Sequence, residues 1–135
     1  MSSLEFNIDN KIWKVWDKLE NLKNLLQNIS DCHILKEIGG NFSVNILLTD
    51  DETIQDLNKR FRGKDFPTNV LSFPQYDKID TISHDDKIFI GDIAMSYEKI
   101  MRESLEFNLK FFDRCTHLFV HGVLHLFGMD HMNEI

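Results

Sequence analysis

The segment spanning residues 110–127 limits the possible folds of this 135-residue chain more than any other. Its spacing is helical, but apolar residues occupy most of the helix circumference, namely Phe111, Phe112, Cys115, Leu118, Phe119, Val120, Leu124 and Phe127. A helix that is apolar nearly all round has to be buried. We therefore expect a long helix near the end of the chain that lies at the centre of the molecule, with the other elements packed around it.

The remaining chain alternates strand-like and helix-like patterns. Four segments have the alternating or clustered apolar residues of strands, namely residues 4–10, 42–50, 69–73 and 87–96. Three segments have helical spacing, namely residues 11–30, 50–62 and 97–108, and residues 31–38 add a turn of helix. This order indicates an α/β or α+β arrangement. We expect an α+β fold, with one domain over residues 1–135 and a roughly four-stranded mixed sheet packed with helices.

Local features refine three of these elements. The helix over residues 11–30 is expected to be continuous, with one apolar face formed by Ile12, Val15, Trp16, Leu19, Leu22 and Leu26. Thr49 followed by Glu52 resembles a capping box, which predicts that the next helix starts there and ends at Gly63. Gly91 inside its strand predicts a bulge or a close approach of two backbones.

The composition restricts the class of protein. With 42% hydrophobic and 27% charged residues, the chain fits a single globular domain. It has no run of about 18 apolar residues, and its N-terminus has no signal-peptide pattern, so we expect a cytoplasmic protein without membrane contact. Cys32 and Cys115 match no C-x-x-C pattern and are expected to be reduced thiols.

The formal net charge of -7 argues against binding nucleic acid by bulk electrostatics, because such binding relies on Lys and Arg displacing counterions. A role with nucleic acid would need a local basic patch. The candidates are in the segment NKRFRGKD, namely Lys59, Arg60, Arg62 and Lys64. On charge alone, this cluster also fits a solvated helix end, where the helix dipole favours cations.

Three histidines near the end of the chain, in HGVLHLFGMDH, predict a metal site. His121 and His125 are four residues apart and lie on one helix face, about 6 Å apart along the axis. Gly128 can end the helix and turn the chain so that His131 returns to the same point. Three imidazoles suit Zn²⁺ or another late first-row divalent ion, with a fourth position open to water as in catalytic sites. The alternative is that these are histidines hydrogen-bonded within the core.

The neighbours of these histidines bear on the chemistry. The spacing H-x-x-x-H-x-x-G-x-x-H is that of metzincin peptidases, which carry Glu as general base directly after the first His, where this chain has Gly122. Peptide hydrolysis by that route is therefore not expected. His117 lies one turn before His121, too far from His125 to share its ion, and is assigned a supporting role; Asp130 is a candidate for orienting an imidazole. The alternative is that His117 is a histidine satisfied within the core and that Asp130 is simply a turn residue.

Together the motifs resemble the YbeY family of single-strand-specific endoribonucleases. HGVLHLFGMDH resembles the family's histidine signature, FRGKDFPTNVLSFP its upstream motif, and GDIAMS a shorter strand motif. These stretches lie in the expected order between Leu57 and His131. The resemblance rests on these motifs and covers roughly the second half of the chain.

The resemblance implies a metal-dependent ribonuclease in ribosomal RNA maturation, notably of the small subunit, and in ribosome quality control. It implies His121, His125 and His131 as metal ligands and Arg62 as an essential arginine. Its partners would be single-stranded RNA, ribosomal RNA and ribosomal proteins, with no DNA. An arginine beside a divalent ion suits phosphodiester cleavage, because both stabilise negative charge that develops on phosphate oxygens. The attacking group, water or the RNA 2'-hydroxyl, is left open.

Two other functions remain compatible with the sequence. The chain could be a ribosome-assembly binding factor whose metal is structural, and the net charge of -7 would then favour protein contacts as its docking surface. It could instead be a metal hydrolase that acts on another phosphate ester or on an amide. Removing the metal separates the first alternative from a catalytic site, because a structural ion contributes to folding.

Overall fold

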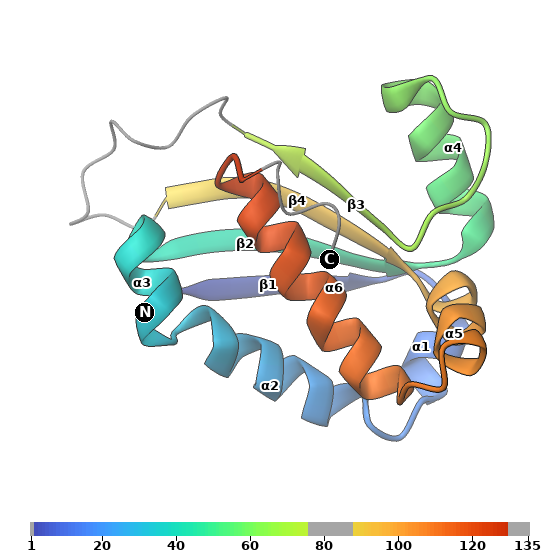
Figure 1. Cartoon of the computed structure of the whole chain (residues 1–135), viewed down its shortest axis with the longest axis horizontal. Helices are drawn as coiled ribbons and strands as arrows, with labels where there is room; N and C mark the ends of the chain where they lie inside the picture. The colour runs from blue at the N-terminus through green and yellow to red at the C-terminus, as the bar shows by residue number, and fades with distance from the viewer. Residues whose placement is uncertain (1, 76–87, 130–135) are drawn as a thin grey trace.

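The computed structural model describes residues 2–75 and 88–129 and contains one mixed sheet with helices on both faces (Figure 1). Its elements are β1 (Ser3–Ile8), α1 (Lys11–Val15), α2 (Leu19–Ser30), α3 (His33–Gly39), β2 (Phe42–Thr49), α4 (Asp51–Arg62), β3 (Val70–Pro74), β4 (Ile88–Ser96), α5 (Tyr97–Glu106) and α6 (Phe111–Leu126). The strand order is β1-β2-β4-β3. β1, β2 and β4 are parallel, and β3 runs antiparallel to β4. The predicted α+β fold with a four-stranded mixed sheet is confirmed.

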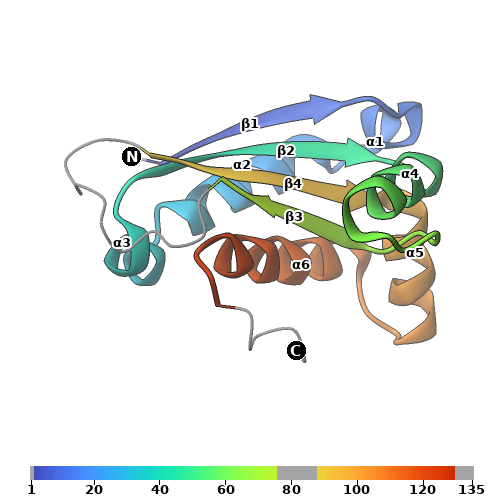
Figure 2. The same ribbon diagram turned by 90° about the horizontal axis from the view of Figure 1, so that it is seen from above.

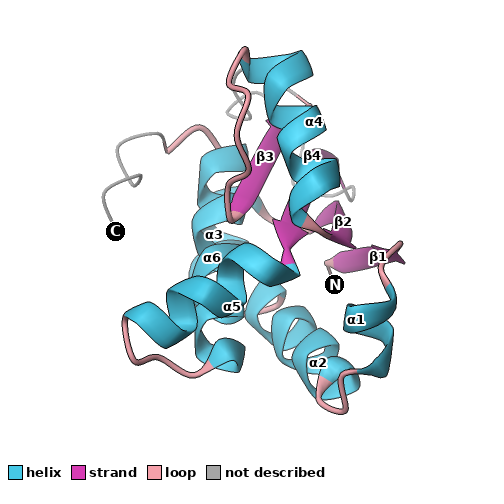
Figure 3. Ribbon diagram, turned by 90° about the vertical axis from the view of Figure 1, so that its right-hand side faces the viewer, coloured by secondary structure: helices cyan, strands magenta, loops and turns pink. Residues whose placement is uncertain are grey.

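The two faces of the sheet are covered differently. α6 crosses one face with α2 beside it (Figure 2), and this layer forms the main core with Val44, Ile46 and Leu48 of β2. α4 packs on the other face, at the β3 and β4 edge (Figure 3), through a small cluster of Ile54, Leu71 and Ala94. Beside α4, the same face carries the polar residues Asn7, Asn45 and Asp92 together with the apolar Leu47.

Helix α6 is central, as predicted. Cys115, Phe119 and Val123 are fully buried, and Leu118 and Leu126 are nearly so. Burial raises the pKa of the Cys115 thiol, and both cysteines are free, as expected for reduced thiols. Within the described ranges, no helix is long and apolar enough to cross a bilayer.

The expected continuous helix over residues 11–30 is wrong, because the chain leaves the helical conformation at Trp16 (φ -70°, ψ 124°). In an unbroken helix, Trp13 and Leu22 would be nine residues apart and would point in opposite directions, about 180° apart. Both are fully buried, which is possible only because the break reorients the chain. Two residues of the predicted apolar face, Ile12 and Val15, are exposed instead.

The break also places two indole rings in the core. The Nε1 atom of Trp13 donates to the carbonyl of Thr49 at 2.9 Å. The rings of Trp13 and Trp16 both contact Phe111 at the start of α6, with centroid distances of 5.7 and 5.0 Å. The N-terminal segment is therefore anchored to the central helix by aromatic packing.

The start of α4 also differs from its prediction by one residue. Asp50, rather than Thr49, caps the helix, since the Asp50 carboxylate accepts from the backbone N–H of Thr53 at 2.9 Å. Thr49 instead ends β2 and is fully buried. The helix ends at Gly63 as predicted, in the left-handed conformation (φ 69°).

Replacing Asp50 with alanine should lower the free energy of unfolding by about 1 kcal/mol, because the cap is lost. The hydrogen bond from Thr53 lowers the pKa of the Asp50 carboxyl. Its stabilisation is therefore present above the pKa of the unfolded chain and is lost as pH falls through the lower folded pKa. Urea unfolding of wild type and Asp50→Ala at neutral and acidic pH measures this contribution. An equal difference in unfolding free energy at the two pH values would contradict the prediction. Asp50→Asn should retain most of the cap.

Gly91 confirms the predicted bulge and close backbone approach. The register between β2 and β4 shifts between Ser43 and Val44, immediately before the pair of Val44 with Gly91, and the φ of Gly91 is 142°. A side chain here would collide with the carbonyl oxygen of Phe73. Glycine therefore allows β3 to lie close against β4. The expected surface loop over residues 75–86 lies almost entirely outside the described residues.

Candidate functional site

A pocket of about 190 Å³ opens between α6, β3 and the end of α4. The residues that line it are Arg62, Val70, Leu71, Ser72, His121 and His125. Two of the three predicted metal ligands therefore share one pocket with the predicted essential arginine. The fold brings these side chains together although β3, β4, α5 and the first part of α6 lie between Arg62 and His121 in the sequence.

The two histidines occupy the partly open flank of a buried helix. The opposite side of α6 is anchored in the core, so successive turns hold His121 and His125 toward the pocket. Partial burial lowers the pKa of His121, and the neighbouring charges of His125, His117 and Arg114 lower it further. This environment favours the neutral imidazole, which is the form that binds a metal ion.

Arg62 is the last residue of α4, and the turn at Gly63 directs the following chain into β3. The Nη2 atom of Arg62 donates to the carbonyl of Ser72 at 2.6 Å. Its guanidinium carbon lies 6.0 Å from the ring centre of Phe73. Contacts to two successive residues of β3 thus fix the guanidinium at the edge strand. Arg62 is exposed in the last turn of α4, as the solvated helix end predicts, and so are Lys59 and Arg60, which pair with exposed carboxylates. Arg62 differs from these two residues because it also lines the pocket.

Ser72 connects the two halves of the site. Its hydroxyl donates to the carbonyl of Gly122 on α6 at 3.4 Å, while its own carbonyl accepts from Arg62. The side chain is buried. Ser72 thus links the arginine to the histidine helix, a role that sequence reasoning did not assign to it.

Gly122 has a packing function. A Cβ atom at this position would lie 3.0 Å from Cδ1 of Ile93 and 3.2 Å from Oγ of Ser72. The position that carries the catalytic glutamate in metzincins therefore faces Ile93 and Ser72 in this chain, and a side chain there would require both to shift. This geometry strengthens the sequence argument against peptide hydrolysis.

Gly122→Ala should destabilise the protein, because overpacking costs about 1–3 kcal/mol and the better helix propensity of alanine returns only about 1 kcal/mol. The shift of α6 away from Ser72 should also weaken the pocket. Thermal unfolding measures the first effect, and the larger Gly122→Leu should lower the melting temperature further. A melting temperature that rises for both variants would contradict the close contact.

A second group of side chains, absent from the sequence analysis, holds the start of β3. Asn69 donates through Nδ2 to Glu103 at 2.9 Å, and Arg114 pairs with the same carboxylate at 3.0 Å. The pair is mostly buried, with 15% and 14% of the two side chains exposed. This network ties the residue before Val70 to α5 and α6. Asn69 and Glu103 are 34 residues apart, and Glu103 and Arg114 are 11 residues apart, so no local sequence pattern predicts this network.

Of the other three predicted site residues, the structure describes only His117. His117 is exposed and does not line it, although its charge affects His121. His131 and Asp130 lie outside the described residues. Within residues 2–75 and 88–129, no group of three His, Cys, Asp or Glu residues has the geometry to hold a metal. The roles of these three residues stay predictions.

Comparison with known proteins identifies relatives of this sequence. A family model described as endoribonuclease YbeY matches residues 7–135. The endoribonuclease YbeY of Neorickettsia sennetsu is 40% identical over 131 residues, which cover 97% of this chain and 85% of that protein. That of Parvibaculum lavamentivorans is 47% identical over 96 residues, 67% of this chain and about half (51%) of its own length.

A solved structure is similar as well. The solution structure of TM1509 from Thermotoga maritima superposes with a TM-score of 0.57 at 30% sequence identity. The match covers 93% of this chain and 70% of that one. The similarity therefore extends over nearly the whole chain.

Proposed function

The chain belongs to the YbeY family of endoribonucleases. From this premise we propose that it is a metal-dependent enzyme that cleaves single-stranded RNA at internal phosphodiester bonds. Its substrate would be ribosomal RNA, during maturation of the small subunit and in ribosome quality control. The observation that carries the proposal is the convergence of His121, His125 and Arg62 on one pocket.

The residues present fit a divalent metal ion. Two imidazoles on successive turns of α6 face the same space, and imidazole nitrogen is a preferred donor for Zn²⁺. The positive φ of Gly128 (89°) bends the chain after α6, in keeping with His131 as a third ligand. Bound there, Zn²⁺ would supply Lewis-acid stabilisation of a phosphate oxygen. Supporting roles for His117 and Asp130 belong to the same proposal.

Arg62 would bind the phosphate that is cleaved. A guanidinium presents a fork of N–H donors that matches two phosphate oxygens, and it stays charged throughout the reaction. The Ser72 carbonyl takes one of these donors and thereby orients the others toward the pocket. Phosphate charge that grows in the transition state would be stabilised by donors already in place.

Cellular context forms the last part of the proposal. The net charge of -7 favours ribosomal proteins, rather than bare RNA, as the main docking surface on a ribosomal particle. The cytoplasm is the compartment in which ribosomal RNA and reduced cysteines occur together, and both cysteines here are free thiols.

The experiment compares wild type with His121→Ala and with His33→Ala as a matched control, since His33 is exposed on α3 and pairs with Glu37. Zn²⁺-loaded proteins are incubated with an end-labelled single-stranded ribosomal RNA fragment and its duplex form, and bound metal is measured separately. We expect wild type and His33→Ala to bind zinc and cut the single strand, and His121→Ala to lose both. Equal cleavage by all three proteins would identify a contaminating nuclease and overturn the proposal.

A further inference from the structure

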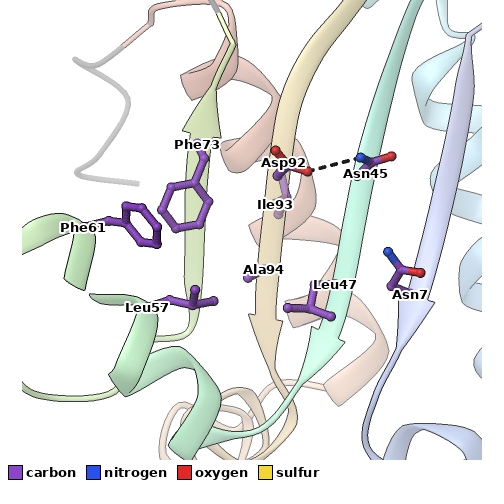
Figure 4. Close-up of a pocket in the computed structure, with 9 residues that line it drawn as sticks. All are labelled: Asn7, Asn45, Leu47, Leu57, Phe61, Phe73, Asp92, Ile93 and Ala94. Carbon is purple, nitrogen blue, oxygen red and sulfur yellow. Dashed lines mark hydrogen bonds between the residues drawn. The ribbon is translucent and has the colours of Figure 1, made fainter. Parts of the chain in front are cut away.

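A second hollow, of about 440 Å³, lies on the open face of the sheet beside α4 (Figure 4). The side chains that line it come from α4 and all four strands: Asn7, Asn45, Leu47, Leu57, Phe61, Phe73, Asp92, Ile93 and Ala94. It is on the opposite side of β3 from the histidines. The pocket and the hollow share no lining residue.

One side of the hollow is aromatic. The rings of Phe61 and Phe73 face each other edge to face, with centroids 5.5 Å apart (Figure 4). Phe61 is 62% exposed, an unusual position for a large apolar side chain. Leu57 and Leu47 continue the apolar surface toward the sheet. An exposed aromatic ring beside a half-buried one and an apolar surface suits the flat face of a nucleobase, which stacks on such side chains.

The other side of the hollow is polar. Asn45 on β2 donates through Nδ2 to Oδ1 of Asp92 on β4 at 3.2 Å (Figure 4). This hydrogen bond orients the Asp92 carboxylate on the face of the sheet that borders the hollow. Asn7 adds a further amide on β1. An ionised carboxylate only accepts hydrogen bonds, so a ligand at Asp92 must present donors. The negative charge of Asp92 also disfavours a phosphate in the hollow, so the phosphate of a bound nucleotide is expected at Arg62 instead.

Arg62 lies at the border between the two spaces. It lines the histidine pocket, its Nη2 atom contacts the carbonyl of Ser72, and its guanidinium lies over the ring of Phe73, which lines the hollow. Ser72 and Phe73 are adjacent in β3 and point to opposite faces of the sheet. A strand whose phosphate binds Arg62 can therefore place a neighbouring base over the edge of β3, against Phe73.

We propose that this hollow binds an unpaired guanine base next to the phosphate held by Arg62. The base stacks on the exposed ring of Phe61 with its edge toward Phe73, and the N1–H and N2–H groups of guanine donate to Asp92. The inference rests on the proposed RNA cleavage, and it names the base that the enzyme would prefer near the cut.

Guanine fits this site better than the other bases for a chemical reason. Its Watson–Crick edge carries two adjacent donors, which match the two oxygens of a carboxylate. Adenine and cytosine offer an amino group beside an acceptor nitrogen, and uracil offers one imino donor between two acceptors. The donors of guanine are reachable only when the base is unpaired. The hollow would therefore also contribute to discrimination against duplex RNA.

The test uses the full chain and the four nucleosides, which lack phosphate and therefore report on the base site alone. Guanosine should perturb the NMR methyl signals of Leu47 and Leu57 and bind about tenfold or more tightly than adenosine, cytidine or uridine. Asp92→Asn should abolish this preference, and Phe61→Ala should weaken guanosine binding. The matched controls are Glu5→Gln, an exposed carboxylate on β1 outside the hollow, and Phe107→Ala, an exposed ring after α5.

Cleavage of short RNAs with one guanine at varied positions supplies the second measurement. We expect cuts at a fixed distance from guanine in wild type and in both controls, and scattered cuts in Asp92→Asn. Equal binding of all nucleosides, or a guanine preference that survives Asp92→Asn, would overturn the base site. A basic peptide that perturbs Asp92 where no nucleoside does would overturn it as well and assign the face to a protein partner.

These results separate the two proposals. Selective guanosine binding by a chain that cuts no RNA would overturn the proposed activity and leave the base site standing. RNA cleavage without base preference would overturn the base site and leave the activity standing. His121→Ala, which should lose cleavage, should still bind guanosine, because the hollow contains no residue of the histidine pocket.

Discussion

Arg62→Ala is expected to lower kcat for RNA cleavage by about 10²–10³, the loss typical when one preorganised donor to a developing negative charge is removed. The fold should survive, because Arg62 is exposed at the end of α4 and its partner, the Ser72 carbonyl, lies on an edge strand where water can replace the guanidinium. Single-turnover kinetics with a labelled single-stranded RNA measure the loss directly.

Two further variants make this prediction specific. Arg62→Lys keeps the charge but loses the planar fork, so it should recover only a small part of the rate. Arg60→Ala removes a nearby arginine that pairs with Asp56 at 2.9 Å and does not line the pocket, so it should cleave like wild type. Equal losses for Arg60→Ala and Arg62→Ala would reduce the role of Arg62 to general surface charge.

The fold was predictable from the sequence where one physical signal dominates. The apolar circumference of α6 requires burial, and the alternation in β2 places Val44, Ile46 and Leu48 on one face; both are found in the core. The break at Trp16 was not predictable in this way. Helical periodicity fits residues 11–30 well, and only the need to bury Trp13 and Leu22 on the same side reveals the break.

The site was predictable in part, for similar reasons. The spacing of His121 and His125 is local and fixes their common face, so the sequence contains it directly. The approach of Arg62 to the histidines depends on the path of the chain through β3, and charge alone does not separate Arg62 from the neighbouring Lys59 and Arg60. The resemblance to a family, rather than any pattern of spacing, pointed to this arginine.

The remaining contacts lie beyond the reach of local patterns. The network of Asn69, Glu103 and Arg114 joins three elements, and the contact of Ser72 with Gly122 spans 50 residues. From the sequence, Gly122 was interpreted only as the absence of the glutamate that metzincins carry at this position. Its close packing against Ile93 becomes visible only when α6 and β4 are placed together.

Removal of the metal should abolish cleavage and leave the fold largely intact. A Lewis acid contributes several kcal/mol to transition-state stabilisation, and each 1.4 kcal/mol or so is tenfold in rate, so a loss of about 10³ is expected. The core does not depend on the ion, because Cys115, Phe119 and Val123 anchor α6 from its buried side. His121 and His125 lie on the partly open flank.

Dialysis against a chelator, followed by circular dichroism, thermal unfolding and cleavage with and without added Zn²⁺, tests this distinction. The helical signal should persist in the chelated protein, and the melting temperature should rise only modestly on adding zinc, as expected for a ligand that binds the folded state. His121→Ala should show no such rise. Loss of the helical signal on chelation would make the metal structural and favour the assembly factor, because an ion needed for folding contributes its binding energy to the fold itself.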